Sequence, residues 1–388
     1  MGTLEAWRNM REVCIVGVGL HKFGRWPEKR VEDTGREAIL AALDDAGAEF
    51  KDIEAGFCGR VFPPITGTGQ SVFGEVGQTG ILIDNVEKAC ASSATAVRIA
   101  AWVVAAGLYD VCLCVGVEKM QRGLIGAVAP GMESMATYWQ LMGMGIMPAQ
   151  YAMGAVRHMK EYGTTREMLA QVAVKSHKNG ALNPYAQYQT PVTLEEVLNA
   201  RMICDPLTLY QCSPTTDGAG AAVVCAKEVA HRFRGKPITI AGWSSGTAEY
   251  QPVGIGGDVS EGMVARLAGE AYERAGLGPE DIDVAQLHDA FSYGEINAIE
   301  ECGFCPRGEA GRFVWEGKAD IDGELPVNTD GGLESRGHPQ GATGIAQIAE
   351  IVCQLRGEAG PRQVPGSPKA GLTHNVGVGG CQMFIFTK

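Results

Sequence analysis

Residues 88–107 read KACASSATAVRIAAWVVAAG, and this stretch places one cysteine, Cys90, directly before a long apolar run. The run from Ser92 to Ala106 contains a single charged residue, Arg98. A helix that is apolar on every side is expected to be covered all round by other layers of the protein. The stretch therefore predicts a buried helix with a thiol at its N-terminal end.

A second stretch of the same design occurs in the C-terminal part of the chain. Residues 341–357 read GATGIAQIAEIVCQLRG, and His338 precedes them much as Cys90 precedes the first helix. Upstream of each stretch, AGAEFKDI at 46–53 matches AGLGPEDI at 275–282, with Ala-Gly and Asp-Ile at identical spacing. The matches occur in the same order, which indicates that the chain contains one half twice.

Each half is expected to alternate strands and helices. The expected strands are 13–19, 54–59 and 111–117 in the first half and 238–244, 284–291 and 372–378 in the second. The expected helices include 38–45 and 93–107, then 267–274 and 341–357. This alternation is typical of layered α/β folds. A helix layer buried between two sheets gives the order helix, sheet, helix, sheet, helix, so the prediction is a duplicated five-layered αβαβα architecture.

The residues between the repeated parts indicate an insertion. Residues 120–205 do not repeat and include the Met- and aromatic-rich segment MESMATYWQLMGMGIMPAQYAMG. Such a segment suits an acyl pocket, but an adaptable core is an equally good interpretation. The expected division is an N-terminal half at 1–119, an inserted loop domain at 120–205, the completion of the first half at 206–232 and a C-terminal half at 236–388.

Composition and charge narrow the class of protein. The chain has 388 residues and a formal net charge of -12, which argues against a nucleic-acid partner. Its 12 cysteines lie mostly inside apolar segments, as reduced thiols of a cytosolic protein do. The N-terminus, MGTLEAWRNMREVCIVG, lacks the features of a signal peptide. No apolar run reaches the roughly 18 residues of a membrane span, so we expect a cytoplasmic protein without membrane contact.

Cys90 is the first candidate for a catalytic residue. At a helix N-terminus, free amide groups and the helix dipole stabilise a thiolate and lower the pKa of the thiol. A thiol of low pKa is a nucleophile, and small neighbours leave space for a substrate carbonyl. A structural role in packing is the alternative for any single cysteine.

Histidines of the second half are candidates for the base that such a nucleophile needs. His338 occupies the position in the second half that Cys90 occupies in the first, so a pseudo-twofold axis would bring the two helix ends together. His374 lies in a Gly-rich strand end, where backbone amides can bind an oxyanion. His288 lies in LHDAF, and any one of these histidines could instead be structural.

Taken together, these motifs resemble those of the thiolase superfamily, and within it those of the sterol-carrier-protein or lipid-transfer type. The stretches that carry the resemblance run over nearly the whole chain: ACASSATAV at 89–97, YGTTREMLAQVAVKSHKNGALNPYAQY at 162–188, CSPTTDGAGAAVV at 212–224, LHDAFSYGEINAIEECGFCP at 287–306, NTDGGLESRGHPQGATG at 328–344 and HNVGVGG at 374–380. The GHP and HNVGVGG motifs are the most specific of them.

The resemblance implies a thiolase fold, usually dimeric, that acts on acyl-CoA thioesters. By residue match, Cys90 takes the acyl group, His338 activates it, and His288 helps to form the oxyanion site for the thioester enolate. His374 stands where other thiolases carry a second, acid/base cysteine. The implied reaction is CoA-dependent thiolysis of a 3-oxoacyl-CoA through an acyl-Cys90 intermediate, with coenzyme A as co-substrate and no bound cofactor.

One position departs from the family pattern. The box around His288 usually reads HDCF, and its cysteine supplies the second acid/base, but Ala290 stands there in this chain. His374, His288 or Tyr293 would then have to move the proton, and Cys381 is a minor candidate. The missing cysteine makes ordinary acetyl-CoA-forming thiolysis less expected and favours a bulky, aromatic or branched acyl group.

The departure leaves related functions open. Thiolases of aromatic degradation, such as the catalytic subunit of benzoylsuccinyl-CoA thiolase, pair with a small zinc-ribbon/OB-fold protein, and this chain could do the same. Lipid-transfer-type aldolases are retro-aldol lyases on a β-hydroxyacyl-CoA, in which we expect the cysteine and the box histidines to be replaced. A non-catalytic acyl-CoA- or lipid-binding subunit is the remaining alternative.

Two further signals are weak. Cys302 and Cys305 form a lone CxxC, which without a second pair does not indicate a metal site, so we expect no metal. A group of basic residues in an acidic chain could meet the phosphates of CoA, although a solvated helix face explains each of them as well: Arg157, His158, Lys160, Arg166, Lys175, His177 and Lys178.

Overall fold

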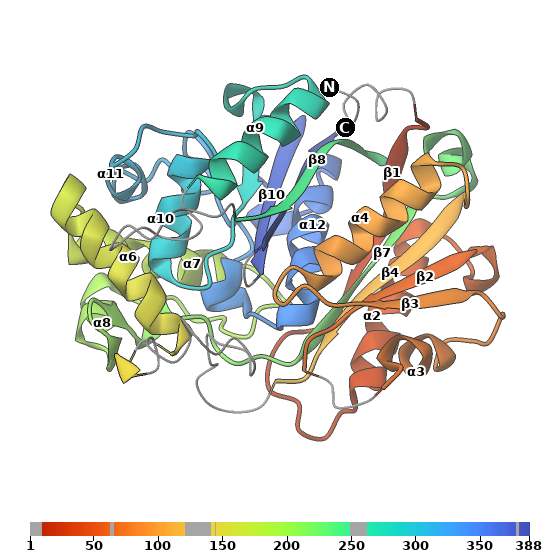
Figure 1. Ribbon diagram of the computed structural model, residues 1–388, viewed down its shortest axis with the longest axis horizontal. Coiled ribbons are helices and arrows are strands. Elements are labelled where there is room, and N and C mark those ends of the chain that lie inside the picture. The colour runs from red at the N-terminus through yellow and green to blue at the C-terminus, as the bar shows by residue number, and fades with distance from the viewer. Residues whose placement is uncertain (1–9, 63–65, 121–140, 144, 249–261, 378–379) are drawn as a thin grey trace.

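The computed structural model describes residues 10–62, 66–120, 141–143, 145–248, 262–377 and 380–388 (Figure 1). Residues 132–140 and 144 of the Met- and aromatic-rich segment lie outside these ranges. In the described part of the chain no helix is both long enough and apolar enough to span a membrane.

The first half of the chain supplies five neighbouring strands of the central sheet. Their order is β3-β2-β4-β7-β1, with bounds Leu82–Val86, Ala55–Gly59, Val111–Glu118, Gly218–Ala226 and Val13–Leu20. β2 runs parallel to both β3 and β4, whereas β7 is antiparallel to β4 and β1. The strands expected at 13–19, 54–59 and 111–117 are therefore confirmed.

The second half repeats this pairing pattern. Its order is β8-β11-β10-β9, with bounds Ile238–Thr247, Gly380–Thr387, Ala370–Gly377 and Val284–Gln286. β11 is antiparallel to β8 and β10, and β10 is parallel to β9. Read outward from the middle, β8-β11-β10-β9 corresponds to β1-β7-β4-β2, so the duplication inferred from sequence is present in the sheet.

The two halves meet at a short seam between β1 and β8. Only Cys14 with Thr239 and Ile15 with Ile238 pair across it. Through this seam the sheet continues from one half into the other as nine strands of the described chain.

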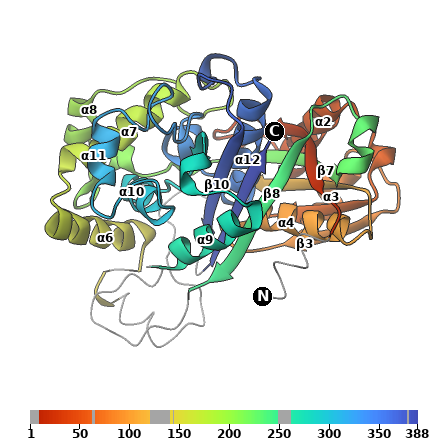
Figure 2. The same cartoon turned by 90° about the horizontal axis from the view of Figure 1, so that it is seen from above.

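Helices complete a layered arrangement around the sheet (Figures 1 and 2). α4 (Ser92–Ala105) and α12 (Gln340–Arg356) share one apolar cluster with strands from both halves. α2 (Val31–Ala46) and α3 (Thr68–Gly74) cover the opposite face of the first half. α9 (Met263–Ala275) and α10 (Ser292–Glu301) cover the second half in the same way. The layered αβαβα order expected from sequence is confirmed, although β1 and β8 join the two expected sheets into one.

The expectation that the first helix is covered all round is wrong. Trp102 of α4 is 39% exposed, with the Arg98 guanidinium 4.0 Å above its ring. The indole of Trp102 packs edge-on against Trp243 of β8. The fully covered helix is α12, in which every residue except Cys353 is buried although its sequence contains several polar residues. Burial here follows position between the layers rather than apolar composition.

The remaining helices and short strands gather beside the second half, on the left of Figure 1. They are α6 (Met147–Tyr162), α7 (Arg166–Gly180), α8 (Leu194–Asn199), α11 (Ala310–Trp315) and the two-stranded ribbon β5–β6 (Met202–Cys204, Leu207–Thr208). A one-turn π-helix, η5 (Gly332–Arg336), directly precedes the loop of His338. The short 3-10 turns are η1 (Phe50–Asp52), η2 (Leu209–Gln211), η3 (Lys227–Arg232), η4 (Pro279–Asp281) and η6 (Gly360–Arg362).

Candidate active site

Three side chains from separate parts of the chain meet at one point. Cys90 lies between β3 and α4, His288 lies directly after β9, and His338 lies before α12. The sulfur and one ring nitrogen of each histidine lie within 4.8 Å of one another. The two imidazole rings meet edge to face, with centroids 5.2 Å apart. The expected approach of Cys90 and His338 is therefore confirmed, and His288 joins them.

The strand expected at 284–291 is shorter than the sequence indicated. β9 ends at Gln286, and Leu287 donates its backbone N–H to Oδ1 of Asn328 at 2.8 Å instead of continuing the ladder. The chain therefore leaves the sheet just before His288, which frees that side chain for the site.

Cys90 sits in a tight loop that strains the backbone. Ala89 has φ of 46°, a left-handed conformation that costs free energy for a residue with a Cβ. Ser92 holds the loop closed, because its Oγ donates to the carbonyl of Ala89 at 2.6 Å and accepts from the N–H of Lys88 at 2.9 Å. The strand end at Gly377 packs directly on the loop, since a Cβ there would lie 2.2 Å from the Lys88 carbonyl oxygen.

The expected lowering of the pKa of Cys90 is wrong. Helix α4 begins at Ser92, so Cys90 precedes it, but burial raises the pKa of the thiol to about 12 and the nearby Glu118 carboxyl adds to the increase. Desolvation of a thiolate outweighs the favourable effect of a helix dipole at this position. The resting residue is a neutral thiol, which needs a base to become a nucleophile.

His338 is held as a neutral base. Its Nδ1 lies 2.7 Å from Oγ1 of Thr343, and this hydroxyl donates its own proton to the carbonyl of Pro339 at 3.0 Å. The hydroxyl oxygen must therefore accept from Nδ1–H, which leaves the lone pair on Nε2. Burial, together with the charge of Arg336, lowers the pKa of His338 to about 3.

His288 has the opposite proton arrangement. Nδ2 of Asn375 lies 3.2 Å from its Nδ1. An amide NH₂ group can only donate, so Nδ1 accepts and the ring proton lies on Nε2. Burial lowers the pKa of His288 well below its usual range, with smaller contributions from His338, His374 and Arg336. The site therefore contains one imidazole that can accept a proton and one that can donate a hydrogen bond.

The structure places His374 behind the other three residues. Its Nδ1 accepts the backbone N–H of His288 at 3.3 Å, and its carbonyl accepts from Gln347 at 3.1 Å. It is not part of the group formed by Cys90, His288 and His338. Nε2 of His374 is buried and has no hydrogen-bond partner among the described residues. Burial lowers its pKa to about 3.

Sequence reasoning missed one residue of this region, Glu118. It ends β4, is buried, and accepts the N–H groups of Gly341 at 2.9 Å and Phe62 at 3.0 Å. Burial raises its pKa to about 7. Its carboxyl thereby binds the first turn of α12, which carries His338 at its entrance. The signal that could have found it is an acidic residue at the end of the apolar strand VCLCVGVE.

The other candidates for a second acid/base have different surroundings. Ala290 is buried in an apolar cluster with Phe291 and Leu333 and offers no acid. Cys381 is fully buried in β11, and burial raises its pKa to about 12. The Tyr293 hydroxyl lies 3.4 Å from Oδ1 of Asn297, on a helix that packs against α6.

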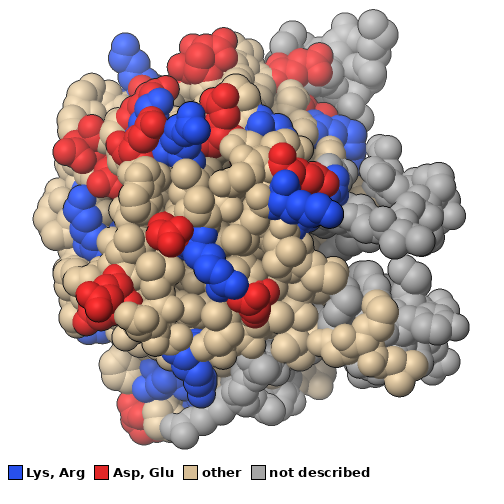
Figure 3. All heavy atoms as spheres, turned by 90° about the vertical axis from the view of Figure 1, so that its left-hand side faces the viewer, with Lys and Arg blue, Asp and Glu red and all other residues tan. Residues whose placement is uncertain are grey.

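The basic residues of α6 and α7 do not form a free cationic patch. His158, Lys175 and His177 are buried. Arg157, Arg166 and Lys178 form ion pairs with Glu161, Asp205 and Asp320. Figure 3 shows acidic and basic side chains interspersed over this face. Lys160 is exposed, and the contact of this group with the CoA phosphates stays a prediction.

Among the described residues, one group of side chains has the spacing of metal ligands. Cys90, His288 and His338 form a thiol–imidazole set of the kind that binds Zn²⁺, whereas Cys302 and Cys305 belong to no such group.

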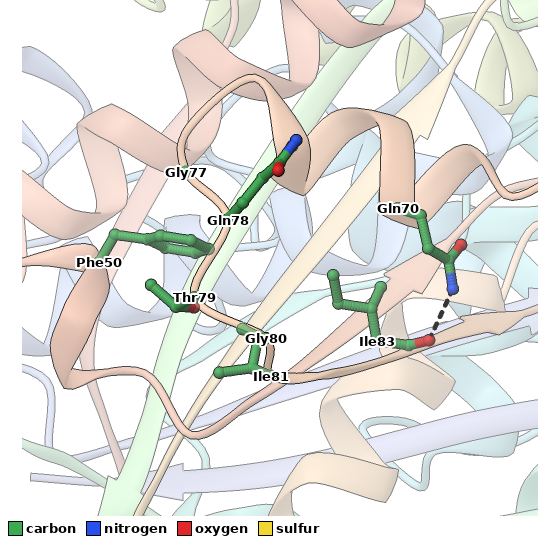
Figure 4. Close-up of a pocket in the computed structure, with 9 residues that line it drawn as sticks. Phe50, Gln70, Gly77, Gln78, Thr79, Gly80, Ile81 and Ile83 are labelled. Carbon is green, nitrogen blue, oxygen red and sulfur yellow. Dashed lines mark hydrogen bonds between the residues drawn. The ribbon is translucent and has the colours of Figure 1, made fainter.

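A separate pocket of about 220 Å³ lies between α3 and β3 (Figure 4). Phe50 and Ile81 line it, and Gln70 donates to the carbonyl of Ile83 at 2.8 Å. None of its lining residues belongs to the candidate active site.

The fold is that of a layered α/β enzyme, and its candidate site brings a thiol and two imidazoles together. Two family models match the chain, "Thiolase, N-terminal domain" over residues 13–228 and "Thiolase C-terminal domain-like" over residues 257–386. The chain belongs to the thiolase family, and it is a thiolase-type acyltransferase.

Curated relatives support the same family over almost the full chain. An acetyl-CoA acetyltransferase of Methanothermobacter thermautotrophicus is 41% identical, with 95% of this chain and 97% of the relative covered. Benzoylsuccinyl-CoA thiolase subunit BbsB of Thauera aromatica is 39% identical, with 96% of each covered. Sterol carrier protein 2 of Oryctolagus cuniculus is 36% identical, with 97% of this chain and 72% of the relative covered. The resemblance to the sterol-carrier type is thereby confirmed.

Among solved structures, the chain is similar to one described as "Ltp2-ChsH2(DUF35) aldolase". The TM-score is 0.84 at 32% identity, with 97% of each chain covered. The fold is therefore shared with a protein described as an aldolase, so the fold alone does not choose between acyl transfer and aldol cleavage.

Proposed function

We propose that the chain cleaves or forms the C–C bond of a 3-oxoacyl-CoA by CoA-dependent thiolysis, through an acyl-Cys90 intermediate. The observation that carries this proposal is the meeting of a neutral thiol with two imidazoles, of which His338 has its free lone pair on Nε2 and His288 has its proton on Nε2. A nucleophile, a base and an oxyanion donor are the groups that acyl transfer through a thioester requires.

In the degradative direction, the Nε2 lone pair of His338 takes the proton of Cys90 as the sulfur attacks the 3-keto carbon. Collapse of the tetrahedral adduct breaks the C2–C3 bond and leaves the acyl group on Cys90. The departing thioester enolate carries negative charge on its oxygen, which the Nε2–H of His288 stabilises. Protonation of C2 completes the first product, and the thiol of CoA then attacks acyl-Cys90 to release the shortened acyl-CoA.

The mechanism also requires a group that donates a proton to C2 of the enolate. We assign His374 to the proton path, because it stands at the matching position in the chain and its buried Nε2–H has no partner among the described residues. It lies next to the site, where its Nδ1 accepts the backbone N–H of His288, and the proton that it would supply is the one on Nε2. Tyr293 and His288 itself are the other candidates, since Ala290 replaces the usual cysteine.

We propose a bulky, aromatic or branched acyl group as the substrate. Support comes from BbsB, a relative named as a benzoylsuccinyl-CoA thiolase subunit. The small Ala290 also faces an apolar cluster with Tyr151 and Phe291, whose rings lie 4.6 Å apart. This cluster joins α6 of the inserted loop domain to the loop of His288, and we propose that it borders the acyl group of the substrate.

We further propose a homodimeric core and a small zinc-ribbon/OB-fold partner subunit. The partner is supported by the similar structure whose description couples Ltp2 with ChsH2(DUF35), and by the relative that is named as one subunit of a thiolase. Both assignments rest on these relatives and on the family resemblance.

A retro-aldol lyase on a β-hydroxyacyl-CoA is the second candidate function. The aldolase with a TM-score of 0.84 favours it. In that reaction Cys90 would be a spectator, as it would be in a non-catalytic acyl-CoA- or lipid-binding subunit. The Cys90–His338 arrangement would then have no chemical use, which is why we place thiolysis first.

Intact-mass analysis after incubation with a panel of 3-oxoacyl-CoA thioesters, with and without a candidate partner subunit, tests the proposal. We expect an acyl adduct on the wild-type chain that is absent in Cys90→Ser and released by CoA. Cys212→Ser is the matched control, because Cys212 is also half-buried but lies outside the site. Full C–C cleavage by Cys90→Ser would instead establish one of the alternatives.

A further inference from the structure

The side chains of Cys90, His288 and His338 are the one group of three among the described residues whose ligand atoms lie close enough together to share a metal ion. These atoms are within 4.8 Å of one another. A tetrahedral zinc ion bound by thiolate and imidazole holds its ligand atoms about 3.5 Å apart, so side-chain movements of about 1 Å would close the group around an ion. No metal motif in the sequence predicts this set, because its members come from three distant segments.

His338 is already arranged as a zinc-bound histidine needs to be. Its Nδ1 lies 2.7 Å from Oγ1 of Thr343, which accepts the ring proton, so the lone pair of the ring lies on Nε2. A histidine that binds a metal typically donates its second N–H to an oxygen in this manner, which fixes the tautomer and orients the ring. His338 can therefore become a ligand without any change in its protonation.

His288 can take the same arrangement through Asn375. Nδ2 of Asn375 lies 3.2 Å from Nδ1 of His288, whereas Oδ1 of the same amide is buried without a hydrogen-bond partner in the described part of the chain. A half-turn of the amide exchanges these two atoms, so that Oδ1 accepts Nδ1–H and the lone pair of the ring lies on Nε2. The unpartnered oxygen is thus the acceptor that a zinc-bound His288 requires.

The access to this group and the charges around it also suit a cation. Both histidines are 4% exposed, but Cys90 is only half-buried, so an ion can enter past the sulfur. The carboxyl of Glu118 raises the pKa of the Cys90 thiol, which places a negative charge beside the site when that carboxyl is ionised. The positive charge of Arg336, which lowers the pKa of His338, is balanced by an ion pair with Asp330.

We propose that Cys90, His288 and His338 bind one Zn²⁺ ion and that the bound metal switches the site off reversibly. The sulfur, the two Nε2 atoms and one water make up four ligands, and the proton of the Cys90 thiol leaves to solvent as the metal binds. Coordination occupies the lone pair that His338 would use as a base and holds the Cys90 sulfur, so thiolysis should stop until the metal is removed. The inhibition rests on the proposed function, whereas the binding does not.

Metal titrations of the untagged chain, without any acyl-CoA, test the binding. Co²⁺ should give the charge-transfer absorption of a cobalt–thiolate bond at one ion per chain, and Zn²⁺ should displace it. We expect Cys90→Ser to lose this absorption and His338→Ala to weaken Zn²⁺ binding by more than about tenfold, since even the outer partners of ligands contribute about 10- to 100-fold. The matched controls are Cys212→Ser, at another half-buried cysteine, and His231→Ala, at an exposed histidine, and both should bind as wild type does.

Two changes at Asn375 give a result that a general loss of structure cannot imitate. In Asn375→Asp a carboxylate accepts Nδ1–H of the metal-bound His288, so Zn²⁺ should bind about tenfold more tightly than it binds to wild type. Asn375→Ala removes the acceptor and should weaken binding by about tenfold. Weaker binding in both variants, no cobalt–thiolate absorption in wild type, or binding that Cys90→Ser and His338→Ala leave unaltered overturns the proposal.

Protection of the thiol separates this proposal from the proposed function. Zn²⁺ should slow the alkylation of Cys90 by iodoacetamide in proportion to its occupancy, and EDTA should restore the original rate. If the acyl adduct on Cys90 never forms but the metal binds and protects the thiol, thiolysis fails and the zinc site stands. If the adduct forms but Zn²⁺ neither binds nor protects Cys90, the zinc site fails and thiolysis stands.

Discussion

Thr343 determines which nitrogen of His338 carries the proton. Its hydroxyl lies 2.7 Å from Nδ1 of His338 and donates to the carbonyl of Pro339, so it can only accept from the ring. His338 lies just before α12 and Thr343 lies in its first turn, so the start of this helix fixes the position of the hydroxyl relative to the ring. The carbonyl of Pro339 thus determines that the lone pair of the His338 ring lies on Nε2.

Thr343→Val should remove this control without changing the volume of the side chain. His338 could then place its proton on Nε2, where it cannot accept the proton of Cys90. We expect kcat for thiolysis to fall by about 100-fold, the lower end of the range for general-base catalysis. Thr343→Ser keeps the hydroxyl and should retain most activity, and an equal loss in both variants would contradict the assignment.

The reaction of Cys90 with iodoacetamide should increase continuously with pH. Because the pKa of the thiol is raised to about 12, its thiolate fraction should grow roughly tenfold per pH unit from pH 7 to pH 10. Mass spectrometry of the labelled peptide at each pH measures the rate. A plateau below pH 8.5 would instead show a thiolate stabilised by the end of α4.

Glu118→Gln should make Cys90 more reactive above neutral pH. The carboxyl of Glu118 has a pKa of about 7 and raises that of the thiol when it is ionised. Removing the charge should increase the alkylation rate a few-fold at pH 9 and change it little at pH 5, where the carboxyl is already protonated. Glu54→Gln, at the start of β2 and away from the site, should leave the rate unaltered at both values.

Gly377→Ala should displace the loop of Cys90. The new Cβ would lie 2.2 Å from the Lys88 carbonyl oxygen, so either the strand end or the loop must move. We expect a loss of about 1–3 kcal/mol in the free energy of unfolding, as for other overpacked sites. Gly74→Ala is the control, since a Cβ there meets nothing within 4 Å. Urea unfolding of both variants measures the difference.

The internal repeat made much of the fold predictable. Strands expected at 13–19, 111–117 and 238–244 are β1, β4 and β8, because apolar β-type segments recurred in the same order. The same repeat predicts that His338 lies opposite Cys90. Symmetry-related helix entrances must meet if the halves pack about a common axis, and that inference needs no knowledge of individual contacts.

Properties that depend on packing between segments distant in sequence could not be predicted. The pKa of Cys90 follows from burial by both halves, whereas the sequence shows only the adjacent helix. α12 is more deeply covered than α4, although Gln347 and Glu350 make its sequence more polar. The acids of HDAF and GLESRG look like surface residues in the sequence, and only the fold reveals that both are enclosed.

The seam between β1 and β8 has a mechanical consequence for the chemistry. The thiol belongs to one half and both imidazoles to the other, so neither half contains a complete reaction centre. Two residue pairs join the central strands, and α12 packs on α4 and on strands β4 and β7 of the first half. If one half moved as a rigid body relative to the other, the distance from the Cys90 sulfur to the imidazole nitrogens would change by as much as the halves moved. The proposed proton transfer therefore requires that the two halves keep a fixed relative position.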